Sequence, residues 1–393
     1  MAIKTIDDIH LTDIADAIRA QTNQTESMGV SEMASQILSI PRGTTVDTNT
    51  TYSLTKSGST ITLTGSDGSS TSVTDSDTNT TYTLAKSGST IQLKSGNTIV
   101  SSVTDTSDVL FKPYTCPEFF GAVGDGATDD YNAFVACWND AETNQLPIYL
   151  TQNYYISAPM RAFPNLNVYG AGGASVSPAT SFIDYTDSAV HRVMIDNLNI
   201  NSKSMTAPLI RLTCFWSRFN NLHLVNGSHG IYLAKHPDAS TQVENKITNC
   251  NFFYMAYGVY SDEGNVITDG MIQNCNVCST HTGVRLGTSA GWSIYSVHTY
   301  GQSEAGLDLN ACWCTMVSNI YTEADNKYGI NLNCSWYTTI TNCVLRGAKT
   351  ADLFVHADGW QQNTTYKPLI SNVVAEKTSI TKSSTITGCS FTS

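Results

Sequence analysis

Charged residues, and basic ones above all, are scarce in this sequence. Asp, Glu, Lys and Arg make up 14% of the 393 residues, and 33 acidic against 21 basic side chains leave a net charge of −12 at pH 7. Nucleic acids and anionic membrane surfaces attract basic proteins and repel acidic ones. The composition therefore disfavours both as partners.

Long apolar runs are also missing. The first residues, MAIKTIDDIHLTDIADAI, are polar and acidic rather than basic and then apolar, so neither a signal peptide nor a membrane-inserted helix is predicted. Without a signal, the 11 cysteines are expected to be free buried thiols rather than a disulfide framework. The pairs Cys275/Cys278 and Cys312/Cys314 have the spacing of metal half-sites, but no His completes either set. We predict no metal and no cofactor.

What the sequence does contain is a short repeat along its last 230 or so residues. An apolar residue is followed by any residue, usually Asn, an apolar anchor, any residue and generally another apolar residue. The Asn position and the anchor fall at Asn165-Leu166, Asn197-Leu198, Asn221-Leu222, Asn249-Cys250, Asn274-Cys275, Ser296-Val297, Asn319-Ile320, Asn342-Cys343, Asn372-Val373 and Gly388-Cys389. Successive anchors lie 16 to 32 residues apart, a drifting period that indicates a β-solenoid with loops of variable length.

A second series of segments keeps the register of the first. It begins at Gly230, Gly258, Gly283, Gly306, Gly329 and Asp352, eight or nine residues after each anchor. Each rung then has at least two strands with alternating inward apolar residues, and a less regular stretch closes the coil. Asn tolerates left-handed backbone geometry, and rungs stacked roughly 4.8 Å apart let its amides hydrogen-bond along the stack. We expect an internal Asn ladder, with Cys250, Cys275, Cys343 and Cys389 facing inward.

The N-terminal region differs in character. Residues 1–42 predict a helical attachment hairpin, with one helix around Leu11 to Ile18 and a second after Ser31. Residues 43–110 are rich in Ser and Thr and contain a tandem duplication offset by 30, starting at Asp47 and Asp77. Each copy spells a small β-hairpin whose apolar residues are too few to form a core in one chain. The region is either a flexible linker or a shaft in which several chains wrap together, and the clean alternation favours the shaft.

Residues 111–160 predict a capping helix and entry strands for a solenoid over residues 161–393. Thr128 is the expected N-cap, and Asp129 and Asp130 suit the first helical turn. The helix has an apolar face made of Ala133, Phe134, Cys137 and Trp138. A solenoid needs its open end covered, and this helix is the natural lid. We therefore prefer a structural role for the two aspartates over a catalytic one.

The segment FGAVGDGATDD from Phe120, the helix after it and the Asn-rich rungs resemble a known family. They are similar to the pectate-lyase-like right-handed parallel β-helix proteins, especially bacteriophage tailspikes, over roughly residues 117–393. The region before them resembles the attachment and shaft segments of phage tail fibres. The resemblance implies an all-β, single-stranded right-handed parallel β-helix, and a homotrimer made in the host cytoplasm. It also implies attachment to a virion baseplate or tail protein through the N-terminus, and presentation to a bacterial surface polysaccharide.

The motifs of the pectin-cleaving members are not intact here. Only fragments stand at Asp269-Gly270 and His229-Gly230, and we find no acidic cluster for calcium on adjacent rungs. Pectin cleavage is therefore disfavoured.

Outward positions on the middle rungs supply the candidate site. The candidate catalytic carboxylates are Glu304, Asp308 and Glu323, since glycosidic cleavage generally needs two such groups. The candidate substrate-binding residues are Tyr260, His281, Arg285, His298, Tyr300, Tyr321, Lys327 and Arg346. The alternative, which we favour for any named pair, is that Glu323 pairs with Arg346 and Asp308 with Arg285 as ordinary surface ion pairs.

Four tryptophans, Trp216, Trp292, Trp313 and Trp336, recur shortly before anchors. They either stack on sugars or fill the third side of the coil, and we favour the core.

Three functions fit this sequence. The first is a phage tail receptor-binding protein that attaches the virion to bacterial surface polysaccharide. The second is a polysaccharide depolymerase, a glycoside hydrolase or lyase, on the same scaffold. The third is a purely structural virion protein. We favour the first and leave enzymatic activity open.

Overall fold

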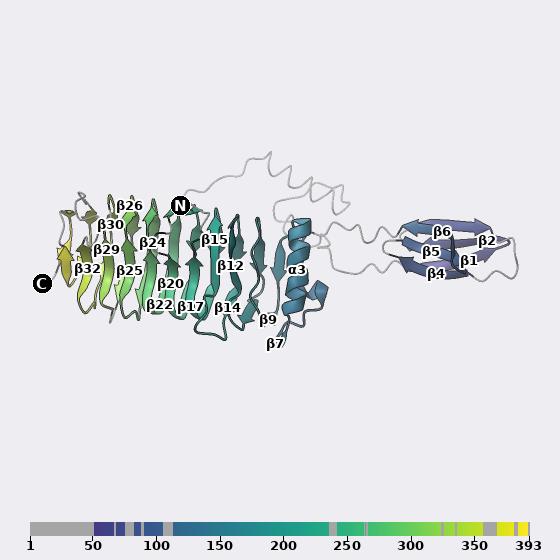
Figure 1. Cartoon of the computed structure of the whole chain (residues 1–393), viewed down its shortest axis with the longest axis horizontal. Coiled ribbons are helices and arrows are strands. Elements are labelled where there is room, and N and C mark those ends of the chain that lie inside the picture. Colours follow the sequence, from purple (N-terminus) through teal and green to yellow (C-terminus); the bar gives the residue numbers. More distant parts are fainter. Residues whose placement is uncertain are drawn as a thin grey trace, which may run out of the picture. The chain divides into compact units, whose positions relative to one another are not determined.

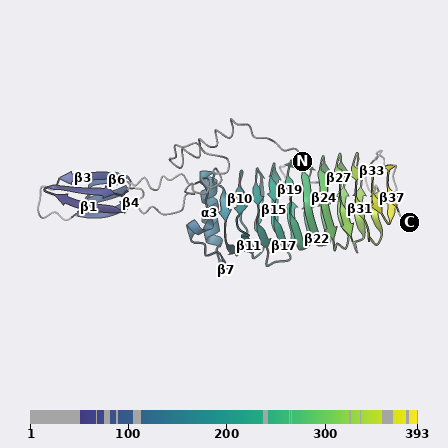
Figure 2. The same ribbon diagram turned by 180° about the vertical axis from the view of Figure 1, so that it is seen from behind.

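The computed structural model describes residues 51–66, 68–74, 82–87, 90–104, 113–235, 242–262, 264, 266–323, 326–334, 336–356, 368–380 and 384–391. The chain divides into two compact units, Met1–Phe111 and Lys112–Ser393, shown from opposite sides in Figures 1 and 2. The predicted helical hairpin of residues 1–42 lies outside the described residues.

Each copy of the N-terminal duplication forms a three-stranded antiparallel sheet. The strands are β1 (Tyr52–Ser57), β2 (Thr60–Gly65) and β3 (Ser70–Thr74) in the first copy, and β4 (Tyr82–Ser87), β5 (Thr90–Ser95) and β6 (Thr98–Thr104) in the second. The predicted hairpins are confirmed, and each gains a third strand that its polar sequence did not reveal.

The two small sheets share a core within one chain. Ile61, Leu63, Ile91 and Leu93 are each at most 7% exposed, and the Thr71 and Ser101 hydroxyls of β3 and β6 lie 2.7 Å apart. The expectation that one chain cannot cover these side chains is therefore wrong for these four. The reason is that the duplication supplies the second layer that a single hairpin lacks. A shaft of several chains stays a prediction.

The second unit is a parallel β-solenoid, as predicted, and its strands stack in three main columns (Figure 1). The first column contains β8 (Ile148–Leu150), β10 (Asn167–Gly170), β13 (Met194–Asp196), β16 (Arg218–Asn220), β19 (Lys246–Thr248), the start of β22 (Met271–Leu286), the start of β24 (Ser293–Tyr300), β27 (Met316–Ser318), β30 (Thr339–Thr341), β33 (Leu369–Ser371) and β36 (Thr385–Thr387).

The second column follows a sharp turn. It contains β7 (Asp125–Asp129), β9 (Asn153–Ile156), β11 (Ser175–Pro178), β14 (Asn199–Asn201), the start of β17 (His223–Leu233), the start of β20 (Asn251–Ser261), the middle of β22, the end of β24, β28 (Tyr321–Glu323), β31 (Val344–Leu345), β34 (Val374–Ala375) and β37 (Ser390–Phe391).

The third column contains β12 (Ile183–His191), β15 (Ile210–Phe215), the ends of β17, β20 and β22, β25 (Ala305–Asn310), β29 (Tyr328–Asn333), β32 (Ala351–His356) and β35 (Thr378–Ile380). A separate short parallel sheet, β18 (Gln242–Val243), β21 (Ile267–Thr268), β23 (Ser289–Ala290) and β26 (Cys312–Trp313), lies between the third column and the next first-column strand in the chain.

Inward side chains of the first column form an unbroken apolar line. Ile195, Phe219, Ile247, Ile272, Ile294, Val317, Ile340 and Ile370 pair each with the next and are fully buried. Burying one such side chain contributes about 1.5–3 kcal/mol relative to leaving it in water. Cys250, Cys275 and Cys343 are buried beside this line as predicted, and Cys389 is partly buried.

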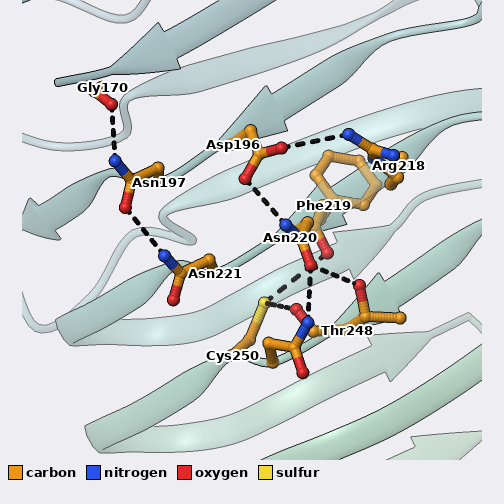
Figure 3. A network of polar contacts seen from close by, with 10 residues as sticks. Gly170, Asp196, Asn197, Arg218, Phe219, Asn220, Asn221, Thr248 and Cys250 are labelled. Atoms are coloured by element: carbon orange, nitrogen blue, oxygen red, sulfur yellow. Dashed lines mark hydrogen bonds and ion pairs between the residues drawn. The ribbon is translucent and has the colours of Figure 1, made fainter. Parts of the chain in front are cut away.

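The turn between the first and second columns confirms the Asn ladder. Asn197, Asn221, Asn249, Asn274, Ser296, Asn319, Asn342, Asn372 and Gly388 all have φ between 51° and 61°. The Nδ2 of Asn221 donates to Oδ1 of Asn197 at 2.7 Å (Figure 3), and Asn372 donates likewise to Asn342 at 3.2 Å. We refer to these nine residues as the asparagine file.

The first predicted copy of the repeat is misplaced. Val168, not Phe163, pairs with Ile195, and the Asn197 Nδ2 donates to the Gly170 carbonyl at 2.7 Å (Figure 3). A Cβ on residue 170 would lie 2.1 Å from the Asn197 carbonyl oxygen. Gly170 therefore stands at the register position of the later turn asparagines, but the Asn197 carbonyl leaves no room there for a Cβ. Asn165 belongs to a different turn.

That different turn forms a second left-handed series, just before the first-column strands. Its members are Asn165, Arg192, Trp216, Glu244, Asp269, Gly291, Cys314 and Tyr337, with φ between 47° and 65°. In seven of the eight, from Asn165 to Cys314, the backbone N–H donates to a carbonyl oxygen of the next rung, for example Arg192 to Phe215 and Trp216 to Val243, both at 2.9 Å. We refer to these eight residues as the mixed file.

Helix α3 (Tyr131–Asn144) covers the first rungs, preceded by the short 3₁₀ helix η2 (Pro117–Phe120). Phe134 and Trp138 are buried, and their rings lie 5.1 Å from Tyr154 and 6.1 Å from Phe182 respectively. The lid prediction is confirmed.

The predicted N-cap of this helix is wrong. Thr128 lies in β7, and α3 begins at Tyr131, because residues 125–129 pair with β9 first. Asp130 is buried and accepts hydrogen bonds from the backbone N–H of Val123 and Gly124, at 2.7 and 3.2 Å. Asp129 accepts from the backbone N–H of Tyr131 at 3.1 Å. Both aspartates accept hydrogen bonds from backbone N–H groups, which supports the structural role.

Candidate functional site

Outward residues of the third column form one continuous vertical line. Tyr232, Tyr260, Arg285, Asp308, Asn331 and Phe354 are paired rung by rung. Arg285 Nη1 lies 3.7 Å from Asp308 Oδ2, and Asn331 Nδ2 donates to Asp308 Oδ1 at 2.9 Å. The register derived from the Gly-led segments therefore places these side chains correctly.

Outward residues of the second column form a compact polar group, which we name the Glu323 cluster: His298, Tyr300, Tyr321, Glu323 and Arg346. Strand pairing sets His298 beside Tyr321 and Tyr300 beside Glu323. Tyr321 donates to Glu323 Oε2 at 2.5 Å, and Arg346 Nη2 donates to the same oxygen at 3.2 Å and also to the Tyr321 hydroxyl. His298 Nε2 lies 3.4 Å from Glu323 Oε1.

The surroundings of the candidate carboxylates bear on their chemistry. Hydrogen bonds from Tyr321 and Arg346 lower the pKa of Glu323. Glu304 lies 3.8 Å from Lys327, with both side chains about half exposed. The three predicted carboxylates thus stand in three ion pairs with Lys327, Arg285 and Arg346. A general acid for glycosidic cleavage needs a raised pKa, and Glu323 has the opposite shift.

An aromatic cluster precedes these ion pairs along the solenoid: His229, Tyr232, Tyr257, Tyr260 and His281. The His229 ring is 4.8 Å from Tyr257 and lies nearly parallel to it, while Tyr257 lies 4.9 Å from His281. Tyr232 and Tyr260 pack edge to face at 5.0 Å. Burial lowers the pKa of His229 to about 4, so its ring is neutral at pH 7.

Sequence reasoning found Tyr260 and His281 but missed His229 and Tyr257 as site residues. These two stand just before Gly230 and Gly258, directly paired in the register. The sequence feature that could have identified them is their position immediately before each glycine. A side chain at that position also points outward and lies close to the third column.

The four tryptophans do not behave alike. Trp292 is fully buried, which confirms the core prediction for that residue. Trp313 and Trp336 are partly buried and pack edge to face at 5.9 Å. Trp216 is 50% exposed and lies in the mixed file, so the core prediction is wrong for it.

Two further features concern ligands and membranes. Within the described ranges, no group of three or more His, Cys, Asp or Glu side chains is placed to hold a metal ion. In the same part of the chain, no helix has the length and apolarity to cross a membrane.

Comparison with known proteins identifies the fold. No protein-family model matches the sequence, and no curated protein matches it. The tailspike protein of Acinetobacter baumannii phage AM24 superimposes with a TM-score of 0.54 and 12% identity, over 87% of this chain and 62% of that one. The two share a β-solenoid fold. This chain spans less than two thirds of that tailspike.

Weaker likenesses extend to another virus and to a bacterial adhesin. ORF18 of Geobacillus virus E2 aligns with a TM-score of 0.48 and 13% identity, over 77% of this chain and 68% of that one. The Streptococcus pneumoniae surface protein and adhesin PfbA aligns with 0.44 and 11%, over 71% and 97%. At identities this low, a structural similarity concerns the fold alone and does not establish the function.

Proposed function

We propose that this chain is a phage tail receptor-binding protein that attaches the virion to a bacterial surface polysaccharide. The observation that carries the proposal is the continuous outward line of Tyr, Arg, Asp, Asn and Phe side chains on the solenoid wall. A polysaccharide is itself an extended, repeating molecule, and such a wall offers it contacts at every rung.

The chemistry of the wall suits sugars. Tyrosine rings present an apolar face to the C–H groups of a pyranose, and their hydroxyls exchange hydrogen bonds with its hydroxyls. Arg285 and Arg346 add planar donors for hydroxyl or carboxylate oxygens. The tailspike-type fold supports this role. The homotrimer, attachment of the N-terminal region to a baseplate or tail protein, and a virion location belong to the same proposal.

Binding without cleavage fits the carboxylates better than catalysis. Glu304, Asp308 and Glu323 each lie within 4 Å of a basic side chain, and the pKa of Glu323 is lowered. Neutralised pairs of this kind orient binding groups, whereas a general acid needs an environment that keeps its proton.

The test is an array of bacterial capsular and O-antigen oligosaccharides probed with the full chain. We expect selective binding that falls about tenfold in Tyr260→Ala, because a stacked ring is lost. Binding of nothing on the array would overturn the proposal in favour of a structural virion protein.

A second assay separates binding from cleavage. We expect no new reducing ends when the wild-type chain is incubated with a glycan that it binds. Release of reducing ends by wild type that is abolished in Glu304→Gln, Asp308→Asn or Glu323→Gln would instead establish a depolymerase.

A further inference from the structure

Bulky residues occupy strained backbone positions on this molecule without being buried. Among the described residues, three aromatics have a positive φ: Trp216 at 51°, Tyr254 at 56° and Tyr337 at 47°. The same three are the most exposed aromatics of that part of the chain, at 50%, 62% and 70%. Left-handed geometry disfavours large side chains, and an exposed ring recovers little through burial. Folding alone therefore does not select them.

Two residues of the mixed file show that its turn does not require a bulky side chain. Asn165 and Gly291 occupy the same turn as Trp216, with φ of 64° and 65°, and these residue types adopt such geometry readily. The solenoid can thus make this turn without strain. Two consecutive rungs nevertheless carry Arg192 and Trp216 in it.

Trp216 and its neighbours form a platform on this edge of the solenoid. The Arg192 Cζ lies 5.8 Å from the centre of the Trp216 ring, and the rings of His191 and Phe215 lie 6.4 and 6.3 Å from it. Glu244, the next residue of the mixed file, is exposed. With rungs roughly 4.8 Å apart, the backbones of Arg192 and Glu244 stand about 10 Å apart with Trp216 between them.

We propose that Trp216 is the floor of a saccharide subsite, flanked by Arg192 and Glu244 and separate from the wall of the second and third columns. The half of the Trp216 surface that is exposed to water can receive the C–H face of a pyranose ring. Arg192 supplies donors and Glu244 acceptors for the ring hydroxyls on either side, so the subsite binds one neutral sugar unit. The inference rests on the proposed function, because it extends glycan binding to a second surface of the same chain.

The test compares variants of the full chain on the same array of capsular and O-antigen oligosaccharides, with thermal unfolding measured in parallel. Trp216→Asn is expected to weaken binding about tenfold while its Tm stays equal to or above that of wild type, since Asn relieves the backbone. Trp216→Phe keeps a ring and is expected to retain most of the binding. Arg192→Asn and Glu244→Asn are expected to weaken binding about threefold each.

The matched control is Asn165→Gly, which changes the same turn one rung before Arg192 and is expected to bind like wild type. Unchanged binding by Trp216→Asn removes the subsite and leaves the proposed function standing. A fall in Tm of more than about 5 °C, or a changed oligomeric state by sedimentation, identifies Trp216 as structural and also overturns the subsite. A wild-type chain that binds no glycan overturns both proposals together.

Discussion

The asparagine file and the mixed file both require a left-handed backbone at every rung, but they fill that position with different kinds of residue. In the asparagine file, seven of the nine left-handed residues are Asn, and its amides bond to the neighbouring rung, as Asn221 does to Asn197. In the mixed file, the eight positions carry eight different residue types, including Arg, Trp, Glu and Tyr. A residue type that recurs from rung to rung indicates a side chain that the fold requires. Varied residue types indicate a position at which the fold accepts many side chains.

The strongest way to break this comparison is to put a branched residue into the asparagine file. Asn249→Val places a β-branched side chain at a φ of 57° and removes amide bonds to Asn220 at 2.8 Å and Asn274 at 3.3 Å. We expect the free energy of unfolding to fall by about 2–4 kcal/mol, measured by urea denaturation. Asn249→Gly keeps the backbone geometry and is expected to cost about 1 kcal/mol. Equal losses in the two variants would contradict a backbone origin.

A second prediction is that the difference in stability between these two variants does not depend on pH. Neither file contains a histidine, so the difference between Asn249→Val and Asn249→Gly should be the same at pH 7 and pH 5. The whole unit, however, contains the partly buried His229, whose pKa is lowered from 6.5 to about 4 by loss of solvent.

The sign of the His229 effect follows from proton binding. Between pH 6.5 and 4 the unfolded chain holds a proton on this ring that the folded chain does not, so stability falls as pH falls through that window. We expect a loss of about 1 kcal/mol between pH 7 and 5, allowing for the partial exposure of the ring. In His229→Gln that loss should disappear from urea denaturation curves. A pH dependence identical to wild type would refute the assignment.

The smallest expected effect lies in the mixed file and has the opposite direction. Tyr337 is 70% exposed at a φ of 47°, so Tyr337→Asn exchanges a strained exposed residue for one that fits the turn. We expect a gain of about 0.5–1 kcal/mol in the free energy of unfolding. A clear loss of stability would mean that the fold does require the ring.

The sequence was sufficient for the architecture because the solenoid repeats its constraints. Inward apolar anchors and turn asparagines recur at every rung, and the Gly-led segments reveal the second register. At Gly258, for example, a Cβ would lie 2.5 Å from a methyl carbon of Val277 and 2.7 Å from the Gly283 carbonyl oxygen. A structural constraint that the same residue type meets at many rungs can be recognised from the sequence alone.

Other features were hidden because different residues can meet the same constraint. Gly170 replaces Asn in the first rung, which shifted the predicted copy from Val168 to Phe163. The mixed file has no residue signature, so Trp216 was assigned to the core. The third strand of the first N-terminal sheet is nearly all Ser and Thr, and that of the second, TIVSSVT, has no strict apolar alternation, so each was revealed only by its pairing with the neighbouring strand. In the candidate site, the register predicted the pairs Asp308–Arg285 and Glu323–Arg346, which are confirmed. The Glu304–Lys327 pair and the hydrogen bond from Tyr321 to Glu323 depend on side-chain geometry that the register does not specify.

The tolerance of the mixed file has a consequence for how such a molecule can change. Each of its eight positions accepts a new side chain at a modest, fixed energetic penalty, with no insertion, deletion or repacking of the coil. Exchanges along this edge can therefore accumulate one at a time, and a new outward surface can arise on an unaltered scaffold.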